Sequence, residues 1–237
     1  MKRCGNGISN CGQSWVFRFA SKIRRVSPSE PSLGYGLLYN WYAATDARGI
    51  APSGFRVPSN SDFQILQTTL GGDSTAGGAL KSTRLLADGQ PYWDAPNTGA
   101  TNSSGMSLFP AGIRQVAGTY IQLNTTCQLG TTEANVTWYS IQSNTASMSN
   151  SGFFDTNTGR SITCVSDTVP SSATVTDADG NEYTWVQIGS QYWLKQSLKT
   201  TKYNNGDDIP TGLDNTQWAN TTSGAWAYPN GDSTLPI

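Results

Sequence analysis

Histidine is absent from this sequence of 237 residues. Its absence excludes Ser–His and Cys–His nucleophile arrangements and imidazole metal sites. A glycine-rich phosphate loop of the nucleotide-binding type is also missing. The sequence leaves a glycosidase-like carboxylate pair open, but we interpret Glu133 and Asp155 as loop residues rather than an acid–base pair. We therefore expect a protein that is not an enzyme.

Charged residues and long apolar runs are also scarce. Charged residues make up 13% of the chain, and no apolar run reaches the roughly eighteen residues of a membrane-spanning helix. The basic start Met1–Arg3 is not followed by the apolar segment of a signal peptide. Glycine is abundant, and 8 Trp and 10 Tyr are present. This composition indicates a turn-rich, mainly β or irregular protein with an aromatic core and no membrane insertion.

The net charge of −1 conceals an uneven distribution. Residues 1–31 hold six basic side chains and one acidic one, a net charge of +5, so residues 32–237 carry −6. Two interpretations of this basic arm stay open. It docks to an acidic partner or to nucleic acid, or it is a flexible, solvated leader.

The sequence has four cysteines, at positions 4, 11, 127 and 164. The spacing of Cys4 and Cys11 matches no zinc signature, and no histidine is present to complete one. A disulfide between Cys127 and Cys164 stays open, because it depends on a redox setting that the sequence does not decide.

The segment Tyr35–Tyr42 (YGLLYNWY) alternates large and small side chains, which predicts a buried strand over Leu33–Tyr42. A Pro/Gly turn then leads into Ser59–Asp62, whose residue types can start a helix. Apolar residues at three-to-four spacing predict a helix over Ser61–Leu70. The following Gly-Gly-Asp sequence ends it.

A second short helix is predicted over Ser74–Leu86, and after it turn residues recur every few positions. Short apolar runs predict strands at Ser107–Phe109, Thr119–Leu123, Val136–Ile141 and Ser161–Val165. Short strands with long irregular loops after two helices describe an α+β domain, which we assign to residues 33–167.

Residues 168–237 form a predicted β meander behind a candidate linker, Thr168–Ser172. Strands are predicted over Val175–Asp179, Glu182–Ile188, Gln191–Leu194, Lys199–Tyr203 and Ala225–Tyr228. The tryptophans of this region are expected in a core rather than stacked on a ligand; they are Trp185, Trp193, Trp218 and Trp226.

The run Asp177–Glu182 (DADGNE) resembles part of a calcium loop, because its oxygens stand at alternate positions and a glycine lies among them. It lacks the distal bidentate glutamate, and Asp-Gly-Asn is an ordinary hairpin turn. We expect no cofactor, with calcium at this turn as the minor alternative.

The stretch Gly118–Asp155 combines aromatic and amide side chains with many Ser and Thr and only two charges. This mixture is typical of a recognition surface carried on loops. The alternative is that Trp138 or Phe154 belongs to the core. The predicted ligand-binding residues are Tyr120, Asn124, Asn135, Trp138, Tyr139, Gln142, Asn144, Asn150 and Phe153.

Several motifs in a fixed order carry a family resemblance. They are YGLLYNWYAA from Tyr35, PSGFRVPSNSDF from Pro52, AGGALKS from Ala76, NTGATNSSGMSLFPAG from Asn97 and GRSITCV from Gly159, with TDADGNEYTWVQIG and GAWAYPN in the tail. With these motifs the sequence resembles the large paralogous domain family first noted in Fibrobacter and common in Bacteroidetes. The resemblance implies a C-type-lectin-like fold, in the branch shared with formylglycine-generating-enzyme-like domains and the variable proteins of diversity-generating retroelements.

The chain departs from the family pattern in order and in detail. In the family the DGNEYTWVQIG piece precedes YGLLYNWY, whereas here it follows, which implies circular permutation or a unit cut from a tandem array. Ala51 stands where the family often has a cysteine that would pair with Cys164. The carboxylate/amide motif of calcium-dependent sugar binding has only a faint echo at Gln90–Tyr92, and the cysteine pair of the oxidase members is missing.

These observations predict a non-enzymatic binding module of a surface or bacteriophage virion protein, located on the virion or the extracellular surface. It would recognise a cell-surface glycan or protein through loops 118–155, with residues 1–32 as a leader or anchoring arm to other virion proteins and no nucleic acid bound. The alternative is a decoration or fibre subunit, a homo-oligomer joined by exchanged strands that binds no receptor. Residues 168–237 would complete the fold in the same or a neighbouring chain, with Ile237 near Ser32.

Overall fold

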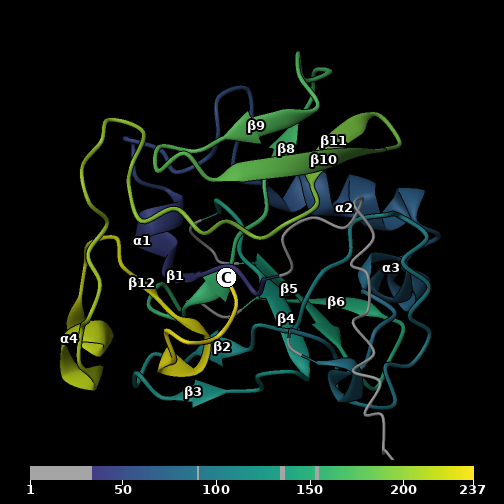
Figure 1. Cartoon of the computed structure of the whole chain (residues 1–237), viewed down its shortest axis with the longest axis horizontal. Helices are drawn as coiled ribbons and strands as arrows, with labels where there is room; N and C mark the ends of the chain where they lie inside the picture. Colours follow the sequence, from purple (N-terminus) through teal and green to yellow (C-terminus); the bar gives the residue numbers. More distant parts are fainter. Residues whose placement is uncertain (1–33, 90, 134–136, 153–154) are drawn as a thin grey trace, which may run out of the picture. The chain divides into compact units, whose positions relative to one another are not determined.

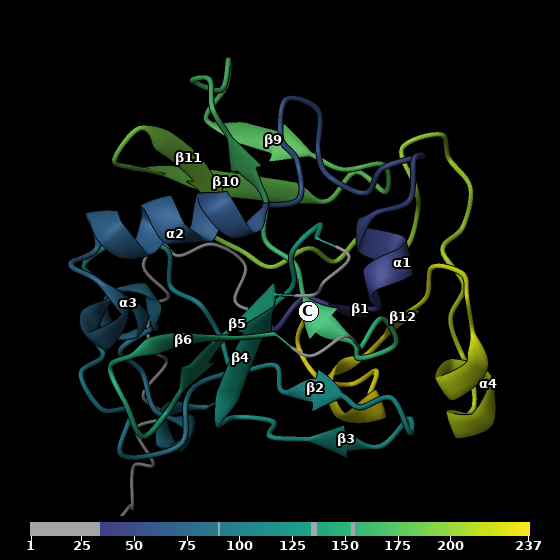
Figure 2. The same cartoon turned by 180° about the vertical axis from the view of Figure 1, so that it is seen from behind.

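Three β-sheets organise the described part of the chain, and helix α2 lies between two of them (Figures 1 and 2). The structure is a computed structural model that describes residues 34–89, 91–133, 137–152 and 155–237, and these belong to one compact unit. Its helices are α1 (Trp41–Ala44), α2 (Asn60–Thr69), α3 (Asp73–Leu80) and α4 (Asn215–Asn220), with 3₁₀ turns η1 (Leu86–Asp88) and η2 (Pro229–Gly231). Its strands are β1 (Leu38–Tyr39), β2 (Ile113–Arg114), β3 (Tyr120–Ile121), β4 (Thr126–Leu129), β5 (Thr137–Gln142), β6 (Met148–Gly152), β7 (Arg160–Ser161), β8 (Val165–Ser166), β9 (Thr174–Thr176), β10 (Glu182–Ile188), β11 (Gln191–Leu194) and β12 (Trp226–Ala227).

The largest sheet has the strand order β12-β1-β7-β4-β5-β6. Its neighbouring strands are antiparallel except β7 and β4, which run parallel with Leu129 opposite Ser161. Successive side chains of a strand point to opposite faces of the sheet. Leu129 and Tyr139 are buried in the core that contains α2 residues. Gln128 and Trp138, their neighbours in the chain, therefore lie on the opposite face of the sheet.

Helix α2 joins this sheet to a second one, which has the order β8-β11-β10-β9. The fully buried ring of Phe63 packs 4.6 Å from the ring centroid of Tyr139 and 5.3 Å from that of Trp193. Burial of a large apolar side chain contributes about 1.5–3 kcal/mol. One face of α2 thus stabilises both sheets, while β2 and β3 form a separate two-stranded sheet.

The predicted helix over Ser61–Leu70 is confirmed as α2. The Ser59 hydroxyl accepts a hydrogen bond from the Asp62 amide, and the Asp62 carboxylate accepts one from the Ser59 amide at 2.7 Å. This reciprocal pair is a capping box. The predicted hairpin of Glu182–Ile188 and Gln191–Leu194 is also confirmed, as β10 and β11. The predicted α+β class holds, with more sheet than helix.

Several predicted elements are shorter in the structure, among them the first strand and the second helix. The strand predicted over Leu33–Tyr42 is confined to β1, because the buried Asn40 side chain accepts hydrogen bonds from the amides of Ala43 and Ala225 and starts α1. The helix predicted over Ser74–Leu86 ends at Leu80 as α3. The next residue, Lys81, is extended, and its ammonium donates to three carbonyl oxygens.

The strand predicted over Lys199–Tyr203 is wrong. The amide and the hydroxyl of Thr201 donate to the Asp179 carboxylate, and Lys202 forms only an isolated bridge with Asp208. The two-helix prediction missed α1 and α4. Helix α4 begins with a capping box between Asp214 and Gln217, a pattern that is visible in the sequence.

The end of the tail lies beside the start of β1. The Tyr35 amide donates to the Pro236 carbonyl at 2.9 Å, and the Gly34 Cα faces the Ile237 backbone so closely that no side chain fits there. Ser32, where we expected Ile237, lies outside the described residues. Residues 168–172 are mostly exposed and connect β8 to β9, two strands of one sheet.

Cys127 and Cys164 are free, and each is buried in a different hydrophobic cluster. Cys4 and Cys11 lie outside the described residues. Of the tail tryptophans, Trp193, Trp218 and Trp226 are buried and Trp185 is partly buried. No helix among the described residues is long and apolar enough to cross a bilayer.

The Asp177–Glu182 run forms a hairpin turn. The Asp177 carboxylate accepts hydrogen bonds from the amides of Asp179 and Asn181 and from the Tyr183 hydroxyl at 2.6 Å. The turn therefore uses these oxygens to hold its own backbone. Among the described residues, no group of three or more Cys, Asp or Glu side chains is placed to hold a metal ion.

Candidate binding site

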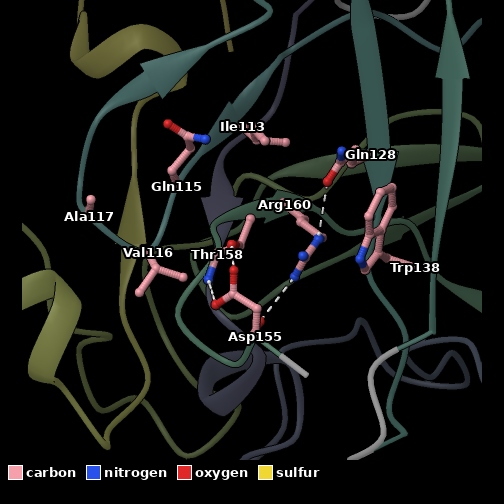
Figure 3. A pocket seen from close by; sticks show the side chains of 9 residues that line it. All are labelled: Ile113, Gln115, Val116, Ala117, Gln128, Trp138, Asp155, Thr158 and Arg160. Atoms are coloured by element: carbon pink, nitrogen blue, oxygen red, sulfur yellow. Dashed lines mark hydrogen bonds between the residues drawn. The ribbon is translucent and has the colours of Figure 1, made fainter. Parts of the chain in front are cut away.

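An open hollow of about 390 Å³ lies on the face of the six-stranded sheet that is turned away from α2 (Figure 3). Strands β4, β5 and β7 form its floor, and the connection between β2 and β3 forms its rim. The lining residues are Ile113, Gln115, Val116, Ala117, Gln128, Trp138, Asp155, Thr158 and Arg160.

Strand alternation places Gln128 and Trp138 in this hollow. Their chain neighbours Leu129 and Tyr139 are paired across β4 and β5 and buried in the α2 core. A one-residue shift of register would exchange the two faces. The same alternation that buries the core therefore directs an amide and an indole to the opposite side.

Arg160 is the cation of the hollow, and only 5% of it is exposed. Its Nε donates to Gln128 Oε1 at 3.2 Å, and its Nη1 donates to the Asp155 carbonyl at 3.3 Å. The guanidinium lies between Asp155 and Trp138 (Figure 3), with Cζ 5.3 Å from the indole centroid. Burial lowers the pKa of Arg160 to about 10, so the side chain is cationic at neutral pH.

The Asp155 carboxylate is engaged by its own turn. It accepts hydrogen bonds from the amides of Asn157 and Thr158, and from the Thr158 hydroxyl. Such an Asx turn fixes the carboxylate locally. Within the described part of the chain, Arg160 forms no ion pair with it or with any other carboxylate.

The rim of the hollow is a tight hairpin. The Gln115 amide donates to the Thr119 carbonyl and the Gly118 amide donates to the Gln115 carbonyl, each at 2.8 Å. Gly118 has φ +83°, and a Cβ there would lie 2.5 Å from the Asn215 side chain of α4. Glycine is required by both the conformation and the close approach. Helix α4 therefore packs against the rim and positions it.

Arg114 supports the rim from behind. Its Nε donates to the Gly118 carbonyl at 3.1 Å and its Nη2 to the Leu213 carbonyl at 2.7 Å. Its Cζ lies 4.1 Å from the Trp218 ring centroid and 5.2 Å from that of Tyr120. Burial lowers the pKa of this guanidinium as well. The Arg114 guanidinium thus lies beside two aromatic rings, and Arg114 is not one of the residues that line the hollow.

A second hollow, of about 470 Å³, is lined mainly by residues 44–57. Its cation, Arg56, forms ion pairs with Asp62 and with Asp167 at 2.7 Å. The charge of that guanidinium is neutralised within the protein. The larger hollow is therefore a weaker candidate for a polar ligand than the one around Arg160.

Of the predicted binding residues that the structure describes, only Trp138 lines the hollow. Tyr120 lies on β3 with its ring beside Arg114, and burial raises the pKa of its hydroxyl. Asn124 has a positive φ of 64°, and its side chain accepts a hydrogen bond from the Tyr35 hydroxyl. Tyr120 and Asn124 therefore have structural contacts.

The other predicted residues are dispersed. Tyr139 is fully buried, and its hydroxyl donates to Asn60 Oδ1 at 2.6 Å, so its ring belongs to the core. The Gln142 carbonyl accepts a hydrogen bond from the Lys81 ammonium. Asn144 and Asn150 are exposed, and Asn135, Phe153 and Phe154 lie outside the described residues.

Sequence reasoning missed Arg160 as a site residue and interpreted Asp155 as a loop residue. One feature of the sequence pointed to Arg160. It directly precedes the apolar run Ser161–Val165, which predicts that it is buried, and a buried arginine usually has a partner. Gln128 gave no such signal, since only the pairing of β4 with β7 brings it to Arg160.

The arrangement offers a flat indole, a cation, two amides and a carboxylate around one open volume. An aromatic face with a few directed polar groups is typical of small-molecule sites, whose volumes are about 300–1,000 Å³. The hollow can therefore hold a polar ligand through hydrogen bonds while an apolar face packs on Trp138.

Residues 5–173 match the family described as the Fibrobacter succinogenes major domain. The match begins inside the segment that we expected to be a leader and ends within residues 168–237, just before the first strand predicted there, Val175–Asp179. No curated protein and no solved structure matches the chain. Because the match covers more than half of the chain, this protein belongs to the Fibrobacter succinogenes major domain family.

Proposed function

We propose that this chain is a non-enzymatic binding module that recognises a cell-surface glycan through the Arg160 hollow. The single observation that carries this proposal is the Trp138 indole beside a buried guanidinium in one open volume of about 390 Å³. A sugar ring has an apolar C–H face and a periphery of hydroxyl groups. The indole suits the first, and the side chains of Gln115, Gln128 and Arg160 suit the second.

The setting of the module is part of the proposal. We infer a C-type-lectin-like fold in circularly permuted order, on a virion or extracellular surface, with residues 1–31 as the anchor to other virion proteins. The antiparallel pairing of β1 with β12 and the hydrogen bond between Tyr35 and Pro236 support the permuted order, because both close the fold within one chain. A protein receptor, or a structural subunit with no receptor, is the competing outcome.

The experiment is glycan-array binding of the full chain and of Trp138→Ala. Loss of the stacking face is expected to weaken binding about tenfold or more, as for a buried aromatic contact. Tyr192→Ala is the matched control, because Tyr192 is a partly buried aromatic residue of β11 that does not line the hollow. Its binding is expected to equal that of the wild type. Thermal melting of all three proteins separates lost contacts from lost folding.

Equal binding by the wild type and Trp138→Ala, at unchanged melting temperature, would move the binding surface elsewhere. An array with no glycan bound, together with binding of the chain to protease-sensitive sites on cells, would favour the protein receptor.

A further inference from the structure

We propose that the glycan carries a carboxylate and that the Arg160 guanidinium binds it. This inference rests on the proposed function and names the class of ligand, a sugar acid such as a uronic acid. It comes from the hydrogen-bonding state of Arg160 and from the charges around it.

Some N–H groups of the Arg160 guanidinium have no hydrogen-bond partner among the described residues. A guanidinium has five N–H groups in a planar fork. Of these, Nε uses one for Gln128 and Nη1 uses one for the Asp155 carbonyl. In the described part of the chain Nη2 has no hydrogen-bond partner. Both N–H groups of Nη2 and one of Nη1 are thus left for a ligand, and a planar guanidinium can bind a carboxylate through two of its N–H groups.

Among the described residues, Arg160 forms no ion pair, and the Asp155 carboxylate acts on its charge only coulombically. A buried charge is costly unless it is paired and hydrogen-bonded. Only 5% of Arg160 is exposed, and no ion pair with a described carboxylate neutralises the charge of its guanidinium. Because the side chain lines an open hollow, an anion can reach it from solvent. The anion would replace the ion pair that the protein does not supply.

The charges of the residues that line the hollow favour a ligand with a single negative charge. Among the described residues that line the hollow, Arg160 is the only cation, and Asp155 contributes one carboxylate. A phosphorylated or multiply sulfated ligand carries more negative charge than a single carboxylate. It usually requires several cations or a cluster of backbone N–H groups. A single carboxylate matches one guanidinium without repulsion from a second negative charge on the ligand. The Trp138 face beside it favours a sugar ring over an extended acidic peptide.

The test alters the ligand first, so that it does not depend on a folded variant. The full chain is probed on oligosaccharides that contain glucuronic, galacturonic or N-acetylneuraminic acid, each printed beside its carboxyl-reduced neutral form. We expect binding to the acidic forms to be about ten- to a hundredfold tighter, the effect of one charge-assisted contact. Sulfated and phosphorylated sugars and poly-glutamate are printed as competing anions.

Variants then assign the effect to Arg160. Arg160→Gln is expected to remove the preference for the acidic form, and Arg160→Lys to keep only part of it because lysine lacks the fork. Arg48→Gln is the matched control, because Arg48 is a surface arginine that does not line the hollow, and both binding and the acid preference are expected to persist. A wild-type chain that binds acidic and reduced forms equally, with binding still lost in Trp138→Ala, overturns this inference and leaves the glycan function intact.

Tighter binding of sulfated or phosphorylated sugars, or of poly-glutamate, would overturn the carboxylate sugar as the ligand. Absence of binding to every printed saccharide would contradict both the inference and the proposed function.

Discussion

Arg114 and Arg160 are two buried arginines of one fold, with exposed fractions of 4% and 5%. Neither forms an ion pair within the described residues. Arg114 donates to the carbonyls of Gly118 and Leu213 and lies 4.1 Å from the Trp218 ring centroid. Arg160 donates to one amide and one carbonyl and has a hollow beside it. The two side chains differ in surroundings rather than in burial.

This difference teaches that burial of a charge does not by itself indicate function. Arg114 donates to two backbone carbonyls, and the rings of Trp218 and Tyr120 lie beside its guanidinium. Its contacts explain its presence through folding alone. Neither guanidinium uses all of its N–H groups in hydrogen bonds with the described residues, but only Arg160 lines the hollow. Unused capacity next to an open volume is what marks a binding residue.

The largest expected effect is on Arg114. Replacement by methionine leaves the carbonyls of the buried Gly118 and the partly buried Leu213 without this donor, and a buried unsatisfied group costs about 1–3 kcal/mol. We expect Arg114→Met to lower the free energy of unfolding by about 3 kcal/mol, measured by urea denaturation. A loss under 1 kcal/mol would show that the Arg114 contacts do not stabilise the fold.

The same substitution at Arg160 is expected to cost less. Arg160→Met exposes Gln128 and the Asp155 carbonyl to a hollow that water can enter, and it removes a buried charge without an ion pair. A buried charge without an ion pair is costly to the folded state, so its removal offsets part of the lost hydrogen bonding. We expect a change within about 1 kcal/mol in the same denaturation experiment, with loss of binding to acidic sugars. Equal destabilisation by Arg114→Met and Arg160→Met would indicate that Arg160, like Arg114, stabilises the fold, and would remove the proposed difference between the two residues.

The smallest expected effect concerns an exposed arginine, Arg48, whose charge is paired. It donates to Asp46 at 2.8 Å and to Asp207 at 3.0 Å. The hydrogen bond from Arg48 lowers the pKa of Asp46 to about 2, from an ordinary 3.8. The folded state therefore binds its proton less readily than the unfolded state, so this stabilisation is present above about pH 4 and is lost as the pH falls toward 2.

We expect Asp46→Asn to lose slightly less stability than the wild type as the pH falls from 4 to 2, measured as the melting temperature across that range. The effect is small because the pair is on the surface, where water screens it. An unchanged acid limb would show that the pair contributes nothing, whereas a large change at pH 7 would contradict its surface character.

Local signals in the sequence predicted part of the fold. The Ser59–Asp62 pair and the apolar spacing after it gave α2, and the turn at Gly189 between alternating segments gave β10 and β11. Elements set by distant contacts were not predictable in this way. Asn40 ends β1 because it bonds to Ala225, and α3 stops at Leu80, next to Lys81, whose ammonium bonds to carbonyls of residues 98, 142 and 145.

The candidate site was likewise only partly predictable from local signals in the sequence. The sequence identified Trp138 because aromatic and amide residues between positions 118 and 155 are visible without coordinates. It did not separate Trp138 from Tyr139, since only sheet register decides which of two neighbours faces the core. It also did not bring Arg160 to Gln128, which are 32 positions apart.

By itself the sequence determined the family, the α+β class and the presence of a polar, aromatic segment without histidine chemistry. Composition, caps and periodicity are local properties, and they act over a few residues. Only the tertiary structure decided which of the two buried arginines lines an open hollow. That distinction depends on the parallel pairing of β4 with β7 and on the hairpin that α4 supports, contacts between segments that the chain order keeps apart.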